Sequence, residues 1–172
     1  MSIRNEFLKK VKRSAARMDP YVWGGQGQKL RKMSLIDLSK METSSDNLNK
    51  VASYVFNKVN CGVDMSKCKI FDCSGLPTYY LGVLGVLPYD TTAQGLYNLC
   101  KKEGCIIKMS EAKPGDLVFR GENDKNIVHV GTYIGDMKVV EAKGRKYGVV
   151  TTDFSDGGWG YCGDILKALH AE

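Results

Sequence analysis

The feature that most constrains the fold of this chain is a change in the period of its apolar residues after Pro114-Gly115. Before this point, apolar residues recur every three or four positions, which is the spacing of amphipathic helices. After it, apolar and polar residues alternate, as in strands with one buried face. Helices first and strands second are typical of an α+β domain, with N-terminal helices packed on a C-terminal antiparallel sheet.

The pattern predicts four helices, at about residues 2–17, 46–60, 71–84 and 92–101. The first ends before Asp19-Pro20, because proline disfavours helix in the residue that precedes it. Ser45 and Asp46 are the candidate N-caps of the second helix. Strands are predicted at residues 116–119, 127–134, 138–142, 147–152 and 161–166.

Length and charge restrict the class of protein. The 172 residues fit one compact domain, and the 25 basic against 19 acidic residues give a net charge of +6. That excess suits an anionic partner such as cell-wall polymer, nucleic acid or a membrane surface, although a solvated helix face is the ordinary alternative. The N-terminus contains no apolar run of a secretory signal, and no stretch of about 18 apolar residues exists. We therefore expect synthesis in a cytoplasm without a signal peptide, and no membrane insertion.

The six cysteines do not form a metal-binding pattern. No Cys-x-x-Cys pair occurs and the chain has two histidines, so no metal or other cofactor is expected. Cys73 differs from the rest because it stands at the predicted start of a helix. Unpaired N–H groups and the helix dipole at such a position favour the reactive thiolate and lower the pKa of a cysteine. A buried structural cysteine is the alternative interpretation.

His129 is the candidate base for such a nucleophile. In the strand predicted at 127–134, His129 and Gly131 share the face opposite the more apolar one, and the glycine leaves space above the sheet. The other histidine, His170, falls in the C-terminal tail. A structural histidine is the alternative, but if the chain has a catalytic base, that base is His129.

Glu141 is the candidate third member. Residues 135–137 read as a hairpin turn, which places the strand at 138–142 antiparallel to the histidine strand. Glu141 then lies close to His129, either directly opposite it or one pair off. A nucleophile–base pair needs a third group to orient the imidazole. The alternative is a glutamate on an edge strand in water.

Five short segments occur in one order: YVWGG at 21–25, FDCSGL at 71–76, LPYDTTAQG at 87–95, KPGDLVF at 113–119 and HVGTYIG at 129–135. Together they resemble the NlpC-type family of bacterial cell-wall cysteine peptidases. The resemblance covers nearly the whole chain apart from residues 28–69 and the C-terminal tail. It implies a papain-like α+β fold and cleavage of peptidoglycan stems between D-glutamate and the following diamino acid. The expected partner is then peptidoglycan and not nucleic acid.

By position, the resemblance places the nucleophile on Cys73, the general base on His129 and the third polar residue on Glu141. Histidine, asparagine or glutamine is more usual at the third position, but related peptidases and amidases of the CHAP type use a glutamate. The family's substrate-binding positions fall on Tyr21, Asp72 and Ser74.

Residues 28–69 depart from the family pattern, because about forty residues separate the glycine-rich loop from the cysteine segment. We expect one domain over residues 1–172 with this segment as an insertion that either shapes the cleft or elaborates the surface. A wall hydrolase without an export signal resembles phage lysins or enzymes carried in a phage tail. Alternative functions on the same scaffold are a CHAP-like amidase, an acyltransferase and a non-catalytic wall-binding or structural module.

Overall fold

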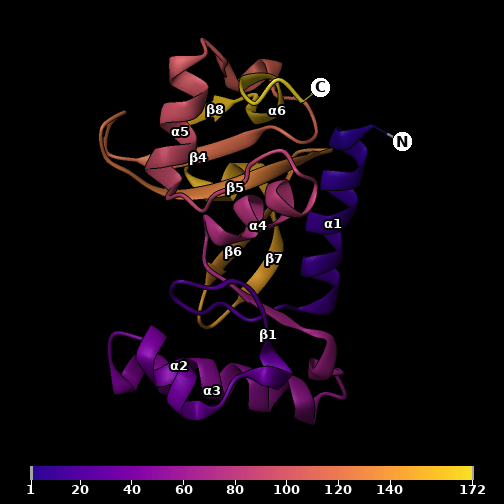
Figure 1. Cartoon of the computed structure of the whole chain (residues 1–172), viewed down its shortest axis with the longest axis vertical. Coiled ribbons are helices and arrows are strands. Elements are labelled where there is room, and N and C mark those ends of the chain that lie inside the picture. The colour runs from indigo at the N-terminus through magenta and orange to yellow at the C-terminus, as the bar shows by residue number, and fades with distance from the viewer. Residues whose placement is uncertain (1, 172) are drawn as a thin grey trace.

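A computed structural model describes residues 2–171, and Figure 1 shows the arrangement of their main elements. The α-helices are α1 (Ile3–Arg17), α2 (Leu35–Met41), α3 (Ser45–Asn60), α4 (Gly75–Val83), α5 (Ala93–Lys102) and α6 (Ile165–Ala168). The strands are β1 (Gln26–Lys29), β2 (Lys69–Phe71), β3 (Ile106–Ile107), β4 (Leu117–Gly121), β5 (Ile127–Gly135), β6 (Lys138–Gly144), β7 (Gly148–Asp153) and β8 (Tyr161–Gly163). Short 3₁₀ turns occur at Leu30–Lys32, Met65–Lys67, Met109–Glu111 and Phe154–Gly157.

The centre of the fold is a six-stranded antiparallel sheet with the order β3-β8-β4-β5-β6-β7. Helices α1, α4 and α5 lie against it, as Figure 1 shows, and this confirms the α+β prediction. The core between them is fully buried and includes Phe7, Val11, Leu81, Leu96, Phe119 and Val140. No helix among residues 2–171 has the length and apolar character needed to cross a bilayer.

The predicted helix around the candidate nucleophile begins later than expected. Phe71 ends a strand, β2, which pairs with β1, and α4 starts only at Gly75. Cys73 therefore precedes the helix and lies in the turn between β2 and α4. The helical pattern of the sequence did not reveal this, because the strand depends on pairing with residues forty or more positions away.

Two further differences are local. The last predicted strand stops at Gly163, since Asp164 caps helix α6 by accepting a hydrogen bond from the Lys167 N–H. Helix α2 was not predicted, although Ser34 and Asp37 form a capping box at its start.

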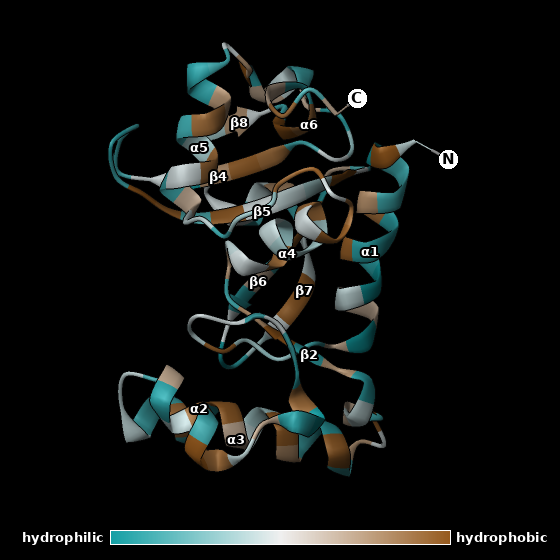
Figure 2. Cartoon of the chain, in the orientation of Figure 1, coloured by the Kyte–Doolittle hydropathy of each residue, from teal (hydrophilic) through white to brown (hydrophobic). Residues whose placement is uncertain are grey.

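The segment at residues 28–69 forms a separate layer of α2 and α3, below the sheet in Figure 1. Its own small core contains Leu38 and Val51 together with Val22 and Ile70. Figure 2 shows hydrophobic positions on both helices of this layer. Several large apolar side chains there are exposed, namely Leu35, Ile36, Phe56 and Val59.

Candidate active site

Asp72 fixes the turn that carries Cys73. Its Oδ1 accepts a hydrogen bond from the Gly75 N–H at 2.7 Å, so it caps helix α4 from outside. Its Oδ2 accepts one from the Gly24 N–H at 3.0 Å, and its own N–H donates to the Gly25 carbonyl at 2.9 Å. The side chain of Ser74 also donates to Asp72 Oδ1, at 3.3 Å. Two of the three predicted binding residues, Asp72 and Ser74, therefore lie beside Cys73 and contact each other.

The thiol of Cys73 is partly buried against the core. Burial, followed by the charge of Asp72, raises the pKa of the Cys73 thiol to about 11, against the opposing effect of the Val130, Ser74 and Cys73 backbone N–H groups. The prediction that a helix N-terminus lowers the pKa of Cys73 is therefore wrong. Cys73 precedes helix α4, and its partial burial removes part of the solvent that would stabilise a thiolate.

His129 and Glu141 are in direct contact. The His129 Nε2 lies 2.7 Å from the Glu141 Oε2, and both side chains are buried, with Glu141 only 2% exposed. The register of β5 with β6 sets Thr132 against Val140, which puts Glu141 diagonal to His129 on the same face, not directly opposite it. The sequence left two registers open, and the structure has the one in which Glu141 is one same-face pair away from His129.

Thr152 on β7 completes this arrangement. Its hydroxyl donates to the Glu141 Oε1 at 2.7 Å, so each carboxylate oxygen has one donor. Burial acts to raise the pKa of Glu141, but the hydrogen bonds from His129 and Thr152 outweigh it and leave the pKa lowered. An ionised Glu141 can only accept, so the His129 Nε2 carries the proton and its Nδ1 is the nitrogen available to another group.

The sulfur of Cys73 lies at the histidine strand. The backbone N–H of Val130, the residue after His129, acts directly on the Cys73 thiol. Val130 lies within β5 and pairs with Phe119 of β4, and both residues belong to the core cluster against which Cys73 packs. The backbone next to His129 therefore lies beside the nucleophile candidate.

Trp159 covers His129 in a way that the sequence did not predict. The two rings are stacked, with centroids 5.7 Å apart and planes 15° apart. A Cβ added to Gly131 would lie 3.0 Å from the Trp159 Cη2, so the space above this glycine holds the indole. The expectation of an open space beside His129 is therefore wrong. The signal in the sequence was a tryptophan among three glycines, which only the tertiary fold connects to His129.

Tyr21 also faces this site. It is buried, forms a β-bridge with Phe71, and packs in the core cluster that Cys73 borders. Burial, and then the nearby Cys73, raises the pKa of the Tyr21 phenol, so the hydroxyl stays protonated and able to donate.

Together these groups can perform nucleophilic acyl chemistry. A thiol, an imidazole with a free Nδ1, and a carboxylate that fixes the imidazole are the parts that a nucleophile–base–orienter site requires. Among residues 2–171, no group of three or more His, Cys, Asp or Glu side chains is arranged to hold a metal ion.

Comparison with known proteins gives the family. The family model described as "NlpC/P60 family" matches residues 18–163. The chain is 36% identical over 90 residues to the probable endopeptidase p60 of Listeria grayi, covering 52% of this chain and 16% of that protein. It is 34% identical over 90 residues to the murein DD-endopeptidase MepH of Escherichia coli, covering 52% of this chain and 32% of the relative. The chain thus spans less than a third of these curated relatives.

A solved structure supports the same fold. RipD from Mycobacterium tuberculosis, described as a non-catalytic NlpC/p60 domain protein adapted to peptidoglycan binding, aligns with a TM-score of 0.60 at 17% identity. The alignment covers 96% of this chain and 99% of that one. The shared fold agrees with the family model, and because that model matches residues 18–163, this chain belongs to the NlpC/P60 family.

Proposed function

We propose that this chain is a cysteine peptidase that hydrolyses the peptide stems of peptidoglycan with Cys73, His129 and Glu141 as its catalytic residues. The observation that carries the proposal is that the turn with Cys73 packs against β5 beside His129. There the Val130 N–H reaches the Cys73 thiol, while the adjacent His129 is held by Glu141 at 2.7 Å. A buried carboxylate that accepts a hydrogen bond on each of its oxygens is suited to orienting an imidazole.

The reaction begins with transfer of the Cys73 proton to the His129 Nδ1 as the sulfur attacks the stem carbonyl. Because burial raises the pKa of the Cys73 thiol to about 11, the thiol rests protonated, and proton transfer accompanies attack instead of preceding it as a stable ion pair. Glu141 stabilises the imidazolium that results. The negative oxygen of the tetrahedral intermediate accepts hydrogen bonds from the Cys73 N–H and the Tyr21 hydroxyl.

Collapse of the intermediate breaks the C–N bond, and the imidazolium gives its proton to the leaving amine. The acyl group remains on sulfur as a thioester. His129 then removes a proton from water, the hydroxide attacks the thioester, and the departing thiolate recovers the proton from His129. The bond between D-glutamate and the following diamino acid is the one that the family resemblance favours. The name of MepH points to a different bond, so the products must decide between them.

Mass spectrometry of muropeptides released from purified sacculi tests this proposal. We expect the wild-type chain to produce new free amines at one stem position, and Cys73→Ser to release none while keeping its circular dichroism spectrum and melting temperature. Full digestion by Cys73→Ser would contradict the proposal.

The same experiment separates the alternative functions. Transfer of an acyl group would give cross-linked or acylated stems, and a CHAP-like amidase would release stems from the glycan. Bound but chemically unchanged wall would indicate a binding module, as RipD is described. We infer in addition that residues 1–172 form one domain with the 28–69 segment as an insertion. The phage setting stays a prediction.

A further inference from the structure

The loop that carries Tyr21 is held between two carboxylates from different parts of the molecule. On one side, Asp72 accepts the Gly24 N–H at 3.0 Å. On the other, Glu42 Oε1 accepts the N–H of Trp23, the preceding residue, at 3.1 Å. Asp72 adjoins the candidate nucleophile, whereas Glu42 is the C-cap of helix α2 in the 28–69 segment. The segment therefore contacts the loop that carries Tyr21 directly.

Glu42 makes a second, stronger contact. Its Oε2 accepts a hydrogen bond from Arg145 Nε at 2.8 Å and lies 2.7 Å from Arg145 Nη2, so two guanidinium nitrogens converge on one carboxylate oxygen. The Glu42 side chain is 0% exposed and that of Arg145 is 19% exposed. Arg145 lies between Gly144 at the end of β6 and Gly148 at the start of β7. One ion pair therefore joins the 28–69 segment to the hairpin that carries Glu141 and Thr152.

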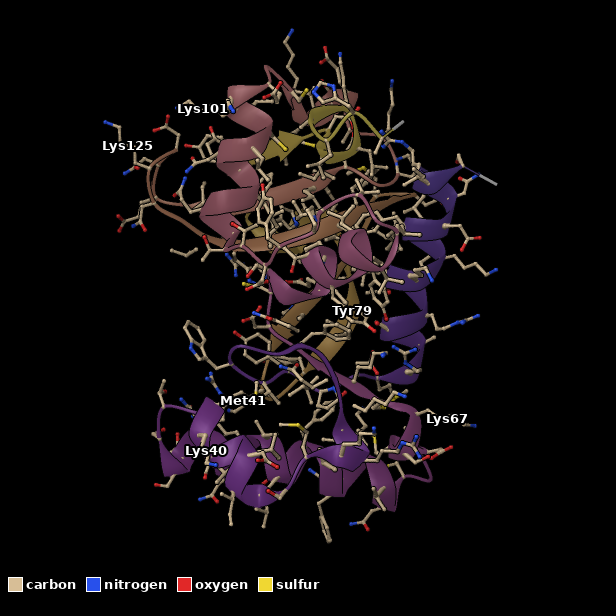
Figure 3. The ribbon with its side chains drawn as sticks, in the orientation of Figure 1. Lys40, Met41, Lys67, Tyr79, Lys101 and Lys125 are labelled. Atoms are coloured by element: carbon tan, nitrogen blue, oxygen red, sulfur yellow. The ribbon has the colours of Figure 1, made fainter. Side chains whose placement is uncertain are left out.

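Arg145 in turn lies over Tyr21. Its guanidinium carbon is 5.5 Å from the centroid of the phenol ring, within the range of a cation–π contact. Met41, the residue before Glu42, packs from the same side, with its Cε 3.9 Å from where a Cβ on Gly24 would stand. Figure 3 shows Met41 on the side of α2 that faces the rest of the molecule.

We propose that Glu42 and Arg145 are positioning residues that hold the Tyr21 hydroxyl at the oxyanion of the reaction, so that the 28–69 segment is part of the catalytic apparatus and not a surface elaboration. This inference rests on the proposed function. Its physical basis is that a buried ion pair with two guanidinium nitrogens on one carboxylate oxygen restricts the orientation of the arginine, and the planar guanidinium transmits that orientation to the ring of Tyr21. A hydroxyl misplaced by about 1 Å costs up to about 100-fold in rate.

Arg145→Lys tests the inference because lysine keeps the charge but loses the second hydrogen bond and the planar contact with the ring. We expect kcat on a soluble stem peptide to fall by about 10- to 100-fold, with KM changed by less than about 2-fold. Glu42→Gln, which keeps an oxygen for the Trp23 N–H, should act in the same direction. A change confined to KM would contradict the inference.

Tyr21→Phe is the variant in which the effect of Arg145→Lys is measured again, to test whether Arg145 acts through the Tyr21 hydroxyl. Removal of one oxyanion donor should lower kcat by about 100-fold or more. If Arg145 acts through the Tyr21 hydroxyl, the double variant Tyr21→Phe/Arg145→Lys should be no slower than Tyr21→Phe alone, within about 2-fold. Multiplication of the two single effects would mean that Arg145 does not act through Tyr21.

Arg17→Lys is a matched control. Arg17 forms a two-pronged pair with Asp19 at 3.1 and 2.6 Å, and these side chains are 22% and 0% exposed, close to the values of the Arg145–Glu42 pair. We expect a similar loss of stability with kcat unchanged. An equal loss of kcat in Arg17→Lys would mean that general loosening, and not the position of Tyr21, causes the effect.

NMR spectra of protein labelled with ¹³C in its tyrosine rings give a readout that needs no turnover. Arg145→Lys should shift or broaden the Tyr21 signal, whereas Arg17→Lys should alter Tyr80, whose hydroxyl Arg17 contacts at 3.0 Å, and leave Tyr21 unchanged. If the wild-type chain releases no stems but the variants show this pattern of signals, the proposed function is contradicted while the positioning of Tyr21 by Glu42 and Arg145 is supported. An unchanged Tyr21 signal in Arg145→Lys would overturn that positioning.

Discussion

Side chains are ordered in different ways in the part of the sheet around His129 and in the layer formed by α2 and α3. At the sheet, strand register brings His129, Glu141 and Thr152 together, and all three side chains have partners within 2.7 Å. In the 28–69 segment, a small core of Leu38 and Val51 suffices, and large apolar side chains such as Phe56 remain exposed.

This difference shows how a small layer can affect chemistry without contributing a reacting group. The sheet fixes the site through many backbone hydrogen bonds, which are spread over its strands. The 28–69 segment acts at a few points, chiefly through Glu42, and through the Tyr54 hydroxyl that donates to the Met18 carbonyl at 2.9 Å. Changes at the sheet should therefore be costly everywhere, and changes in the segment only at those points.

The largest effect is expected for Glu141 at the sheet. Glu141→Gln should lower kcat by about 100- to 10,000-fold, because the amide cannot stabilise an imidazolium and its NH₂ group favours the wrong tautomer of His129. Glu141→Ala should in addition lower the free energy of unfolding by roughly 3 kcal/mol, since it leaves buried partners without an acceptor. Stem-release kinetics and urea unfolding measure both. Undiminished rates in both variants would exclude Glu141 from catalysis.

A smaller effect, shared by the two regions, is expected at alkaline pH. Burial raises the pKa of Cys162 in the sheet and the pKa of Cys68 in the segment to about 12, above the value of about 8.5 in an unfolded chain. Above pH 8.5 the unfolded state therefore binds fewer protons than the folded state, and stability falls as pH rises toward 12.

At pH 9.5 the expected loss is about 1.4 kcal/mol for each such thiol. Urea unfolding under reducing conditions at pH 7.5 and 9.5 measures it. Cys162→Ala and Cys68→Ala should each reduce the pH dependence. An unfolding midpoint that does not change between these two values would contradict the assignment of buried, neutral thiols to both regions.

The smallest effect is expected at the exposed face of the segment. Phe56 is 66% exposed, so Phe56→Ser should change the free energy of unfolding by less than about 0.5 kcal/mol and leave kcat unchanged. Thermal melts and stem-release assays of Phe56→Ser and Arg145→Lys, measured side by side, compare the exposed face of the segment with its contact through Glu42. A large loss of activity in Phe56→Ser would mean that the segment acts through its surface as well as through Glu42.

The sequence predicted much of the fold and the pairing of His129 with Glu141, because periodicity assigns residues to faces of strands and a short turn fixes which strands are neighbours. It could not choose between the two registers, since shifting by one same-face pair leaves the pattern unchanged. It placed Cys73 in a helix because the pairing of β2 with β1 depends on distant residues.

The sequence also could not predict the contacts of Trp159, of Thr152 and of the Glu42–Arg145 pair, because these contacts depend on distant residues. Each joins segments that no local pattern connects, as the separation of 103 residues between Glu42 and Arg145 illustrates. A lone glutamate at the end of an unrecognised helix carries no signal of its own.

The central claim is that the sulfur of Cys73 and the Nδ1 of His129 share one proton. ¹⁵N NMR of the histidine rings tests it directly, because the chain has two histidines and the exposed His170 serves as an internal control. We expect His129 to be protonated on Nε2, and its Nδ1 resonance to move in Cys73→Ala while both His170 resonances stay in place. An Nδ1 resonance of His129 that does not respond to the loss of the sulfur would contradict the claim.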